Sequence, residues 1–418
     1  MKIEMIRTFH PVGQGAFYSE EFSHDGKVVF RVVYDCGCIN RKEAKARGQA
    51  VVEKWIQGWR EHRRIDYLFI SHFDYDHVSL LDVLVKQRVA VDRVILPLLC
   101  RNEKRTLLNF YRGILGDKEY RMIESVLCAT GGLFDKVRKI VYVERAGRAP
   151  RVPGNSFDEL DDRDGGSKTM TVPSGTVFRM ADAGLNLGTD EGWCYIPCNH
   201  DVRVRRKELC ELLHEKFGAK FNIRSLTNFR KIMSRCSRKT VRSILKGIYN
   251  ELEGGINANS MVVYSGPENQ SSFWRAGPFV ITPFAEIEQD SESVLLAAIR
   301  GQPIRTSVPG CVYTGDVDLK RVNIQGWFKH FWKCVGTIQI PHHGSANSFV
   351  IDAYAKGGFF CPVSCSSLRH YGHPHPCVAN DLLLHGDFPV FVTESQCFVQ
   401  RFFLNDYTDA EENDDQDG

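Results

Sequence analysis

The apolar positions in the first third of the chain alternate between short runs typical of strands and longer segments with helical spacing. The runs predicted as strands are 3–9, 28–34, 65–70, 92–97 and 137–143. The segments predicted as helices are 41–62, 78–85 and 103–128. Strands that alternate with helices in this order favour a layered α/β fold.

Strands and a few helices return later in the chain. The predicted strands there are 172–183, 259–264, 279–284, 310–318, 335–340, 359–365, 389–393 and 396–404. Helices are expected over 319–332 and over a segment that ends at His385. We therefore expect residues 1–150 and 256–405 to form one domain, with residues 151–255 inserted into it.

The predicted insertion has two unlike parts. Residues 151–170 hold a Pro-Gly turn and an acidic run, and are expected to be an exposed loop. Residues 203–246 hold fourteen Lys or Arg against three Glu, with apolar positions at the spacing of two or three amphipathic helices. Basic helices can contact the phosphates of a nucleic acid. The insertion is also a candidate surface for a protein partner, and a solvated charged face is the alternative to both. The candidate contact residues are Arg203, Arg205, Arg206, Arg230, Lys231, Arg235, Arg238 and Lys239.

Composition narrows the class of protein. Hydrophobic residues make up 43% of the 418 residues and charged residues 25%, as in globular proteins. The fourteen cysteines form no CxxC pair, which argues against a zinc ribbon or a thioredoxin-like site. Neither a signal peptide nor an apolar run of membrane-spanning length is found, so we expect a cytoplasmic protein without a membrane partner. Residues 406–418 are mostly acidic and are expected to be a disordered tail.

Candidate chemistry begins directly after the strand predicted over 65–70. His72, Asp74, Asp76 and His77 follow within a few positions, on a turn that leads into a helix. Imidazoles and carboxylates are ligands for divalent metals, and four of them on one loop favour a metal site over a solvated turn.

Two further predicted strands end in residues of the same kind. Asp316 follows Thr314 and Gly315 at the end of one strand, and His342 and His343 follow another. Polar residues at the ends of buried strands are costly unless they meet a partner. Convergence on one or two divalent cations accounts for all three segments, and the two oxygens of Asp316 suit it to bridge two metals.

Seven motifs, in order along the chain, resemble those of the metallo-β-lactamase superfamily, in its competence-protein (ComEC-like) branch. They are Val12-Gly13-Gln14-Gly15, Asp35-Cys36-Gly37, the loop from His72 to His77, Asn259-Ser260-Met261-Val262, Thr314-Gly315-Asp316, Pro341-His342-His343-Gly344-Ser345 and Tyr371-Gly372-His373-Pro374. The resemblance covers residues 1–100 and 256–405 and implies a stand-alone member without the membrane channel.

The resemblance implies an αββα sandwich with the site at one edge of the sheets. His72 and Asp74 would then serve a first metal and Asp76 and His77 a second, with Asp316 as the bridge. Of the later pair, His342 is the preferred ligand, and His343 is a second ligand or a support for one. Besides Asp76, the candidate catalytic residue is His373, which would protonate a leaving group or orient a substrate phosphate, unless it is only a turn residue.

Two features depart from the pattern of the superfamily. Asp74 stands where a histidine is usual, which shifts the expected metal from zinc toward manganese, magnesium or iron. The histidine often found between the metal loop and Asp316 has two candidates here, His200 and His214, and His214 lies beside leucines on a predicted helix and is expected to be structural.

The sequence thus predicts a metal-dependent hydrolase, with a phosphodiesterase or nuclease as the leading interpretation. The basic insertion would hold a polyanionic substrate. Two alternatives remain open: a hydrolase of a small ester, lactone or thioester, and a metal-binding module of little or no activity in a multi-protein assembly.

Overall fold

A computed structural model describes the larger part of the chain. The described residues are 3–60, 62–146, 167–180, 192–201, 203–218, 220–225, 231, 237–252, 259–269, 274–277, 279–283, 308–353, 357–367 and 372–404. The acidic run expected in the loop and the expected tail, 406–418, lie outside these residues.

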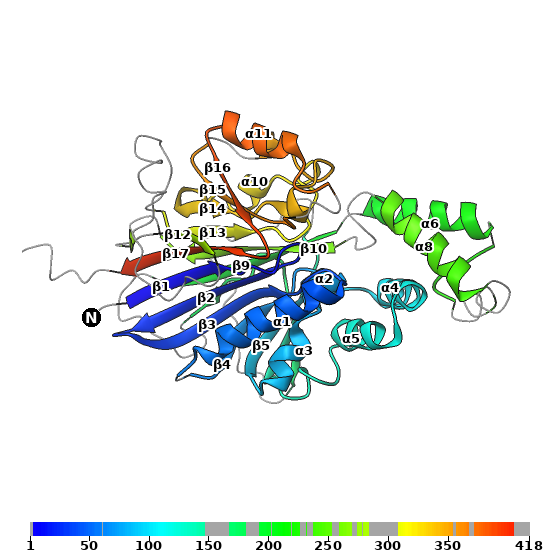
Figure 1. Ribbon diagram of the computed structural model, residues 1–418, viewed down its shortest axis with the longest axis horizontal. Coiled ribbons are helices and arrows are strands. Elements are labelled where there is room, and N and C mark those ends of the chain that lie inside the picture. The colour runs from blue at the N-terminus through cyan, green and yellow to red at the C-terminus, as the bar shows by residue number, and fades with distance from the viewer. Residues whose placement is uncertain are drawn as a thin grey trace, which may run out of the picture.

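Two sheets form the centre of the described structure (Figure 1). The strands of the first, in spatial order, are β11 (Trp274–Ala276), β17 (Gln396–Leu404), β1 (Ile3–Phe9), β2 (Phe17–His24), β3 (Lys27–Cys36), β4 (Arg64–Phe69), β5 (Ala90–Pro97), β6 (Lys139–Val143) and β7 (Thr169–Val172), and β12 (Val280–Pro283) also pairs with β17. Those of the second are β16 (Phe388–Val392), β15 (Phe360–Ser364), β14 (Val335–Ile338), β13 (Gly310–Tyr313), β10 (Asn259–Pro267), β9 (Trp193–Asp201) and β8 (Phe178–Arg179). β3 to β7 run parallel, as do β13 to β16.

Helices cover the outer faces of both sheets (Figure 1). Those beside the first sheet are α1 (Lys42–Gln57), α2 (Tyr75–Val78), α3 (Leu81–Lys86), α4 (Arg101–Ile114) and α5 (Asp117–Cys128), and those beside the second are α10 (Ile324–Trp327) and α11 (Pro376–Leu384). The predicted mixed α/β class is therefore confirmed.

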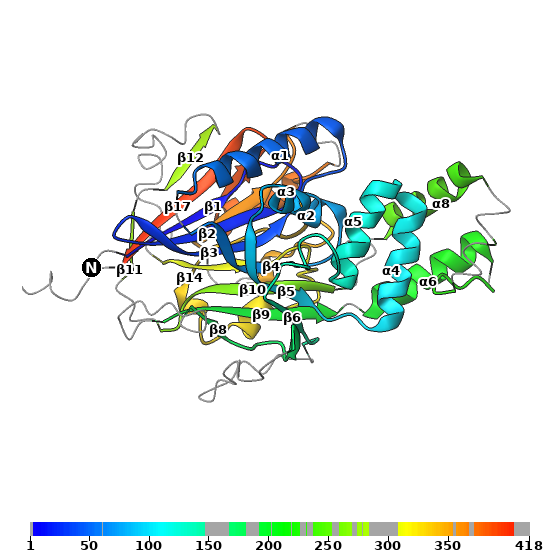
Figure 2. The ribbon, with the colours of Figure 1, turned by 90° about the horizontal axis from the view of Figure 1, so that it is seen from below.

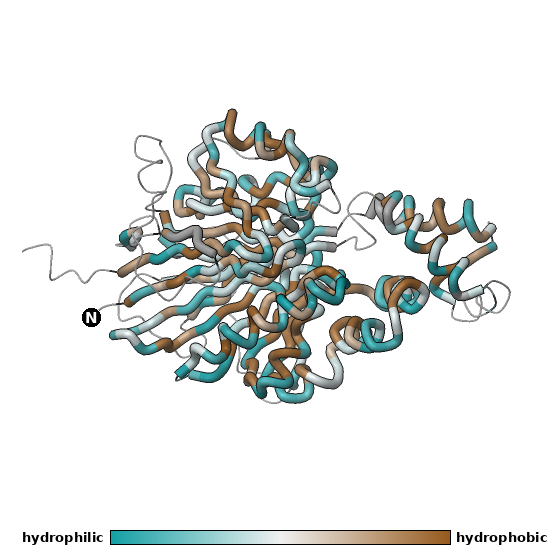
Figure 3. Tube along the Cα trace, in the orientation of Figure 1, coloured by the Kyte–Doolittle hydropathy of each residue, from teal (hydrophilic) through white to brown (hydrophobic). Residues whose placement is uncertain are grey.

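Alternation along the buried strands explains the layers. On β4, Leu68 packs toward the helices, whereas its neighbours Tyr67 and Phe69 belong to the core between the sheets. On β13, Val312 likewise faces the outer helices and Tyr313 the inner core. Because successive side chains point to opposite faces, a strand buried on both faces reads as one continuous apolar run. Hydrophobic positions accordingly recur along the strands of both sheets (Figure 3).

A buried ion pair fixes how the sheets face each other. Arg7 Nε donates to Glu20 Oε1 at 2.8 Å on the first sheet. From the second sheet, Tyr195 and Tyr313 donate their hydroxyls to Glu20 at 2.8 and 2.9 Å, and Ser265 donates at 2.7 Å. Burying a carboxylate is tolerable only when such partners satisfy it. The network holds β13 over β2, and β13 is the strand that leads to the candidate ligand Asp316.

Several predicted elements need correction. The strand expected over 172–183 is divided, because residues 173–177 leave the ladder between β7 and β8. The helix expected over 319–332 is reduced to the single turn of α10, and the run over 78–85 forms parts of α2 and α3. β2 and β9 carry many polar or small residues and were not predicted from the sequence.

Part of the predicted insertion belongs to the main body, because β7, β8 and β9 join the two sheets. The described residues after β9 include the helices α6 (Arg203–Phe217) and α8 (Arg238–Glu251), which lie beside α4 (Figures 1 and 2). Leu213 of α6 and Leu245 of α8 are buried in the same apolar cluster as the helices on the first sheet. Asn109 of α4 also donates its side-chain amide to the carbonyl of Ile223 at 2.6 Å. The insertion is therefore packed onto the main body through apolar contacts. In the described part of the chain, no helix has both the length and the apolar character needed to cross a membrane.

Candidate metal centre

The loop after β4 is held from behind by Asp35, at the end of β3. Asp35 Oδ1 accepts the backbone N–H of Ser71 at 2.7 Å, and Oδ2 accepts the Ser71 hydroxyl at 2.6 Å. Oδ2 also accepts Nδ1 of His77 at 2.8 Å. Asp35 is fully buried, and it supports the loop through these three hydrogen bonds.

The Gly-Gln-Gly turn packs against the same loop. Ala16 donates its N–H to the carbonyl of Asp76 at 3.1 Å. A Cβ on Gly15 would lie 2.5 Å from the carbonyl oxygen of Gly37, so the close approach requires glycine. The turn is therefore a part of the site's support, and its central residue, Gln14, lines the cavity described below.

Four histidines are held at the same ring nitrogen, Nδ1. Nδ1 of His72 is 2.8 Å from the Ser71 hydroxyl, and Nδ1 of His342 is 3.1 Å from that of Ser348. Nδ1 of His343 is 2.9 Å from the carbonyl of Ser364, and that of His77 contacts Asp35, as described above. Carbonyls and carboxylates only accept hydrogen bonds, and the Ser71 hydroxyl donates its proton to Asp35, so the neutral rings of His77, His343 and His72 present their lone pair at Nε2. This is how metal-binding histidines are usually oriented.

Asp316 lies where these Nε2 atoms meet. Its Oδ1 is 3.3 Å from Nε2 of His77, and its Oδ2 is 3.6 Å from Nε2 of His72 and 3.9 Å from that of His342. Nε2 of His343 is 3.2 Å from Asp76 Oδ2. The structure thus brings together ligand types from three distant segments of the chain.

Two groups of donor atoms are close enough to share an ion. His72, His77 and Asp316 form one, and Asp76, His77 and His343 form the other, with the donor atoms of each within 4.8 Å of one another. This arrangement differs from the expected pairs, because His72 shares a group with His77 and Asp316 instead of with Asp74. His343 joins a group, although the sequence favoured its neighbour His342.

The residues present fit a divalent metal. Nε2 of His72 is buried and forms no hydrogen bond within the described structure, and Nε2 of His77 is buried with Asp316 Oδ1 at 3.3 Å. A buried unsatisfied polar atom costs about 1–3 kcal/mol, and coordination would remove that cost. The structure is therefore compatible with a metal ion held by His72, His77 and Asp316.

Asp74 makes contacts that the sequence did not reveal. Its Oδ1 accepts the hydroxyl of Tyr111 from α4, and its Oδ2 accepts the hydroxyl of Tyr249 from α8 at 3.0 Å. Burial and the nearby Asp76 raise the pKa of Asp74 to about 6, against the lowering effect of the Tyr111 bond. Neither tyrosine stands in a sequence motif, and each is brought to the site by the packing of its helix.

The strand ends that carry Asp316 and the histidine pair adopt unusual backbone conformations. Gly315 has φ of +56°, and a Cβ there would lie 2.6 Å from Ser260 Oγ. His342 and His343 have φ of +50° and +56°, in the left-handed region that side chains disfavour. Such local strain is found mainly where it positions functional groups.

Electrostatics couple the acids and histidines. Burial lowers the pKa of His77, but Asp316 and Asp35 outweigh it and raise the pKa well above 6.5. Burial also opposes protonation of His343, yet its hydrogen bond to Asp76 raises the pKa above the ordinary value. Burial disfavours ionised Asp316, but the neighbouring histidines, His77 first, hold its pKa well below 3.8. Without metal, the cluster therefore balances its carboxylates with protons on histidine.

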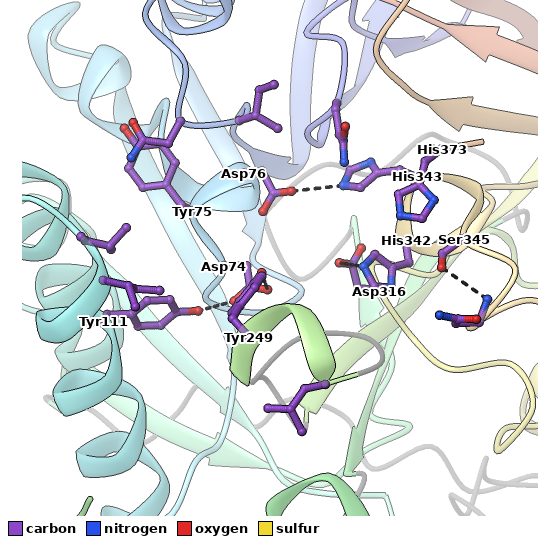
Figure 4. A pocket seen from close by; sticks show the side chains of 17 residues that line it. Asp74, Tyr75, Asp76, Tyr111, Tyr249, Asp316, His342, His343, Ser345 and His373 are labelled. Carbon is purple, nitrogen blue, oxygen red and sulfur yellow. Dashed lines mark hydrogen bonds and ion pairs between the residues drawn. The ribbon is translucent and has the colours of Figure 1, made fainter. Parts of the chain in front are cut away.

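A cavity of about 490 Å³ opens in front of the cluster. Its polar side is formed by Asp74, Asp76, Asp316, His342, His343 and His373, with Gln14, Asn40, Ser345 and Asn347. Its other side consists of Ile39, Tyr75, Tyr111, Ile114, Leu115, Tyr249 and Leu252. Figure 4 shows Tyr111 and Tyr249 approaching Asp74 from one side, with His342, His343 and His373 on the other. The ring of His373 lies 5.9 Å from that of His342, and burial, with His342 and His343, lowers its pKa to about 4.

The remaining predicted residues are less closely connected with the cluster. The ring of His200 packs against Trp327 at 5.7 Å, and neither donor group includes it. Lys231 and Lys239 are exposed. Arg230 and Arg235 lie outside the described residues, as do the side chains of Arg203, Arg205, Arg206 and Arg238.

A second cavity, of about 510 Å³, separates the insertion from the loop after β13. Five carboxylates line it, those of Glu208, Glu211, Glu215, Glu251 and Asp318. Arg321 also lines it and pairs with Asp318, and Leu252 lines both cavities, so carboxylates predominate in the lining of the second cavity, next to the first.

No family model matches the chain, and no curated protein is similar to it in sequence.

Proposed function

We propose that the protein is a metal-dependent hydrolase of phosphodiesters. The observation that carries the proposal is the common orientation of four histidines, each held at Nδ1 with Nε2 directed at Asp316 or Asp76. A structural metal site is usually closed, whereas this one lies at the base of a cavity, as a catalytic site does. The two layers of sheet between helices also fit the αββα sandwich of the metallo-β-lactamase superfamily, to which we propose that the chain belongs, within its competence-protein branch.

The ligands would be His72, His77, Asp316, Asp76 and His343, with His342 at the rim. A divalent ion bound here supplies Lewis-acid polarisation of the phosphoryl group and a water of lowered pKa. The hard carboxylate ligands favour manganese, magnesium or iron over zinc.

Two side chains at the site, Asp76 and His373, have further roles in the proposed reaction. Asp76 is ionised, since His343 and His77 bring its pKa to about 2 against the opposing effect of burial. It can orient a water by accepting its hydrogen bond. The lowered pKa of His373 leaves its ring neutral near pH 7, so it suits hydrogen bonding to a substrate oxygen better than protonating a leaving group.

Size and charge favour a small phosphodiester over a long nucleic acid. A cavity of about 490 Å³ accommodates a molecule of modest size. The carboxylates of the second cavity would repel a polyanion that approached along the insertion. Gln14 is only 7% exposed, lines the cavity and forms no side-chain hydrogen bond with another described residue. Its amide is therefore available for a substrate oxygen.

The apolar wall supports a second candidate, hydrolysis of a small ester, lactone or thioester. Ile39, Ile114, Leu115 and Leu252 would contact an alkyl or acyl chain, whereas a phosphate needs no such surface. The same metal centre would polarise a carbonyl oxygen instead of a phosphoryl oxygen.

The test combines metal analysis with turnover. Purified protein is assayed for bound metal and for hydrolysis of bis(p-nitrophenyl) phosphate, p-nitrophenyl acetate, a lactone, and single- and double-stranded DNA, each with added Mn²⁺. We expect phosphodiester hydrolysis that Asp316→Ala and His72→Ala reduce by about 100-fold or more. Asp92→Asn, which alters a surface pair with Arg138, is the control. Preferred hydrolysis of the acetate or lactone would support the second candidate, and bound metal without any turnover would support a binding module.

A further inference from the structure

Asp74 joins the metal loop to two helices from different parts of the chain. Tyr111 comes from α4, in the main body, and Tyr249 comes from α8, in the insertion, 175 residues from Asp74. Each donates its hydroxyl to a different oxygen of the carboxylate. We call Tyr111, Asp74 and Tyr249 the tyrosine clamp.

The clamp acts within the metal centre. Asp74 is 4% exposed, and its Oδ2, which accepts the Tyr249 bond, is 3.8 Å from Nε2 of His72. Asp74 also lies on the same short loop as the candidate ligands Asp76 and His77. A carboxylate that accepts a donor on each oxygen is fixed in both position and rotation, so the two tyrosines determine where the negative charge of Asp74 lies relative to His72.

The packing of the insertion against α4 places Tyr249 beside Asp74. Leu245 and Ile248, the neighbours of Tyr249 on the inner face of α8, are fully buried against the cluster that contains α4. One turn beyond Tyr249, Leu252 is buried and forms part of the wall of the cavity. If α8 moved away from α4, Asp74 would lose one donor and the cavity would lose one wall.

We propose that the helical insertion is a working part of the metal centre, because its docking and metal binding stabilise each other through the tyrosine clamp. Supporting partners of this kind typically change metal affinity by about 10–100-fold when removed. Linkage requires the effect to be reciprocal: if the docked insertion favours metal binding, bound metal favours docking to the same degree. The inference rests on the metal binding in the proposed function and not on the identity of the substrate.

The first experiment measures metal affinity. Mn²⁺ and Zn²⁺ are titrated against a chromogenic chelator in the wild-type protein and in Tyr249→Phe and Tyr111→Phe. We expect each variant to bind the metal about 10-fold or more weakly. Tyr120→Phe is the matched control, because its hydroxyl contacts Glu124 and Arg112 on the surface instead of Asp74. Circular dichroism melts confirm that each variant is folded. Wild-type affinity in Tyr249→Phe would overturn the proposal.

The second experiment tests reciprocity. Amide hydrogen exchange of 238–251 is measured in the full-length protein with and without Mn²⁺. We expect the metal to slow exchange in the wild-type protein and to slow it much less in Tyr249→Phe. Exchange that is insensitive to metal in the wild-type protein would refute the coupling, as would a wild-type protein that binds no metal.

Turnover separates the two proposals. Metal that protects α8 in a protein without hydrolytic activity would support the coupling and refute the hydrolase. The opposite result is hydrolysis that is lost in Asp316→Ala but kept in Tyr249→Phe, with both tyrosine variants binding metal as tightly as the wild-type protein. It would support the hydrolase and refute the coupling.

Discussion

Replacement of Asp35 by asparagine tests whether the orientation of the histidines creates the metal site. The carboxylate accepts three hydrogen bonds, from the N–H and hydroxyl of Ser71 and from Nδ1 of His77. Asparagine has the same shape but only one oxygen. If that oxygen keeps the Ser71 N–H, the new NH₂ group faces two donors, the Ser71 hydroxyl and the His77 ring. If the amide is reversed, the NH₂ group faces the Ser71 N–H instead.

Either orientation disturbs the loop: the first acts directly on His77, and the second opposes the Ser71 N–H that helps to hold the loop in place. The ring can accept the new N–H at Nδ1 only by moving its proton to Nε2, the atom directed at Asp316. That tautomer offers no lone pair to a metal. Loss of such a supporting partner typically weakens metal binding by about 10–100-fold, which corresponds to about 1.4–2.7 kcal/mol. A smaller opposing effect is expected, since removal of the Asp35 charge lowers the pKa of His77 and reduces competition by protons.

The assay is a competition titration of Mn²⁺ and Zn²⁺ against a chromogenic chelator at two pH values. We expect Asp35→Asn to bind metal more weakly at pH 8, where proton competition matters least, and the loss to be smaller at pH 6. Asp92→Asn, at a surface ion pair with Arg138, should bind as the wild-type protein does. Wild-type affinity in Asp35→Asn at pH 8 would refute the inference that His77 binds a metal through Nε2.

Three further predictions concern the substrate, protons and backbone. Gln14→Ala should raise KM for bis(p-nitrophenyl) phosphate by about 10-fold with a smaller effect on kcat, because a substrate hydrogen bond is lost, and an unchanged KM would exclude that contact. Since the pKa values of His77 and His343 are raised without metal, protons compete with the metal for their ring nitrogens, so metal affinity should fall as pH decreases, by about tenfold per pH unit for each proton displaced, and titrations from pH 6 to 8 that show no slope would contradict this. Gly315→Ala should lower the free energy of unfolding by about 2–4 kcal/mol, from the left-handed backbone and the overlap with Ser260, and denaturant melts equal to those of the wild-type protein would contradict this.

The sequence was most informative where residues that can bind a metal follow directly after an apolar strand. Polar ligand types at the ends of apolar strands, such as Asp316 after β13, predicted that distant segments would meet, and the structure places them together. A strand buried on both faces, such as β13, was evident as an unbroken apolar run. β2 was missed, because polar residues such as Glu20 are buried there in a network that only the folded structure creates.

The tyrosine clamp was beyond sequence reasoning for a similar reason. Tyr111 and Tyr249 resemble ordinary core positions of amphipathic helices, and their role follows from the way α4 and α8 pack together. The contact between the basic insertion and a polyanion stays a prediction. Of its candidate residues, Lys231 and Lys239 are the two whose side chains are described, and both are exposed.

Several features of the site destabilise the fold, and this loss of stability argues that the site has a function. Two left-handed histidines, His342 and His343, cost about 1–3 kcal/mol each. The buried, unsatisfied Nε2 atom of His72 costs about 1–3 kcal/mol. Together these terms reach the scale of the whole net stability of a domain, about 5–15 kcal/mol. All three residues lie within one cluster, and a bound cation would satisfy the nitrogen atom of His72. Residues of a simple solvated turn would relax to a more favourable conformation without losing a function. The presence of these unfavourable features together therefore argues for a metal centre.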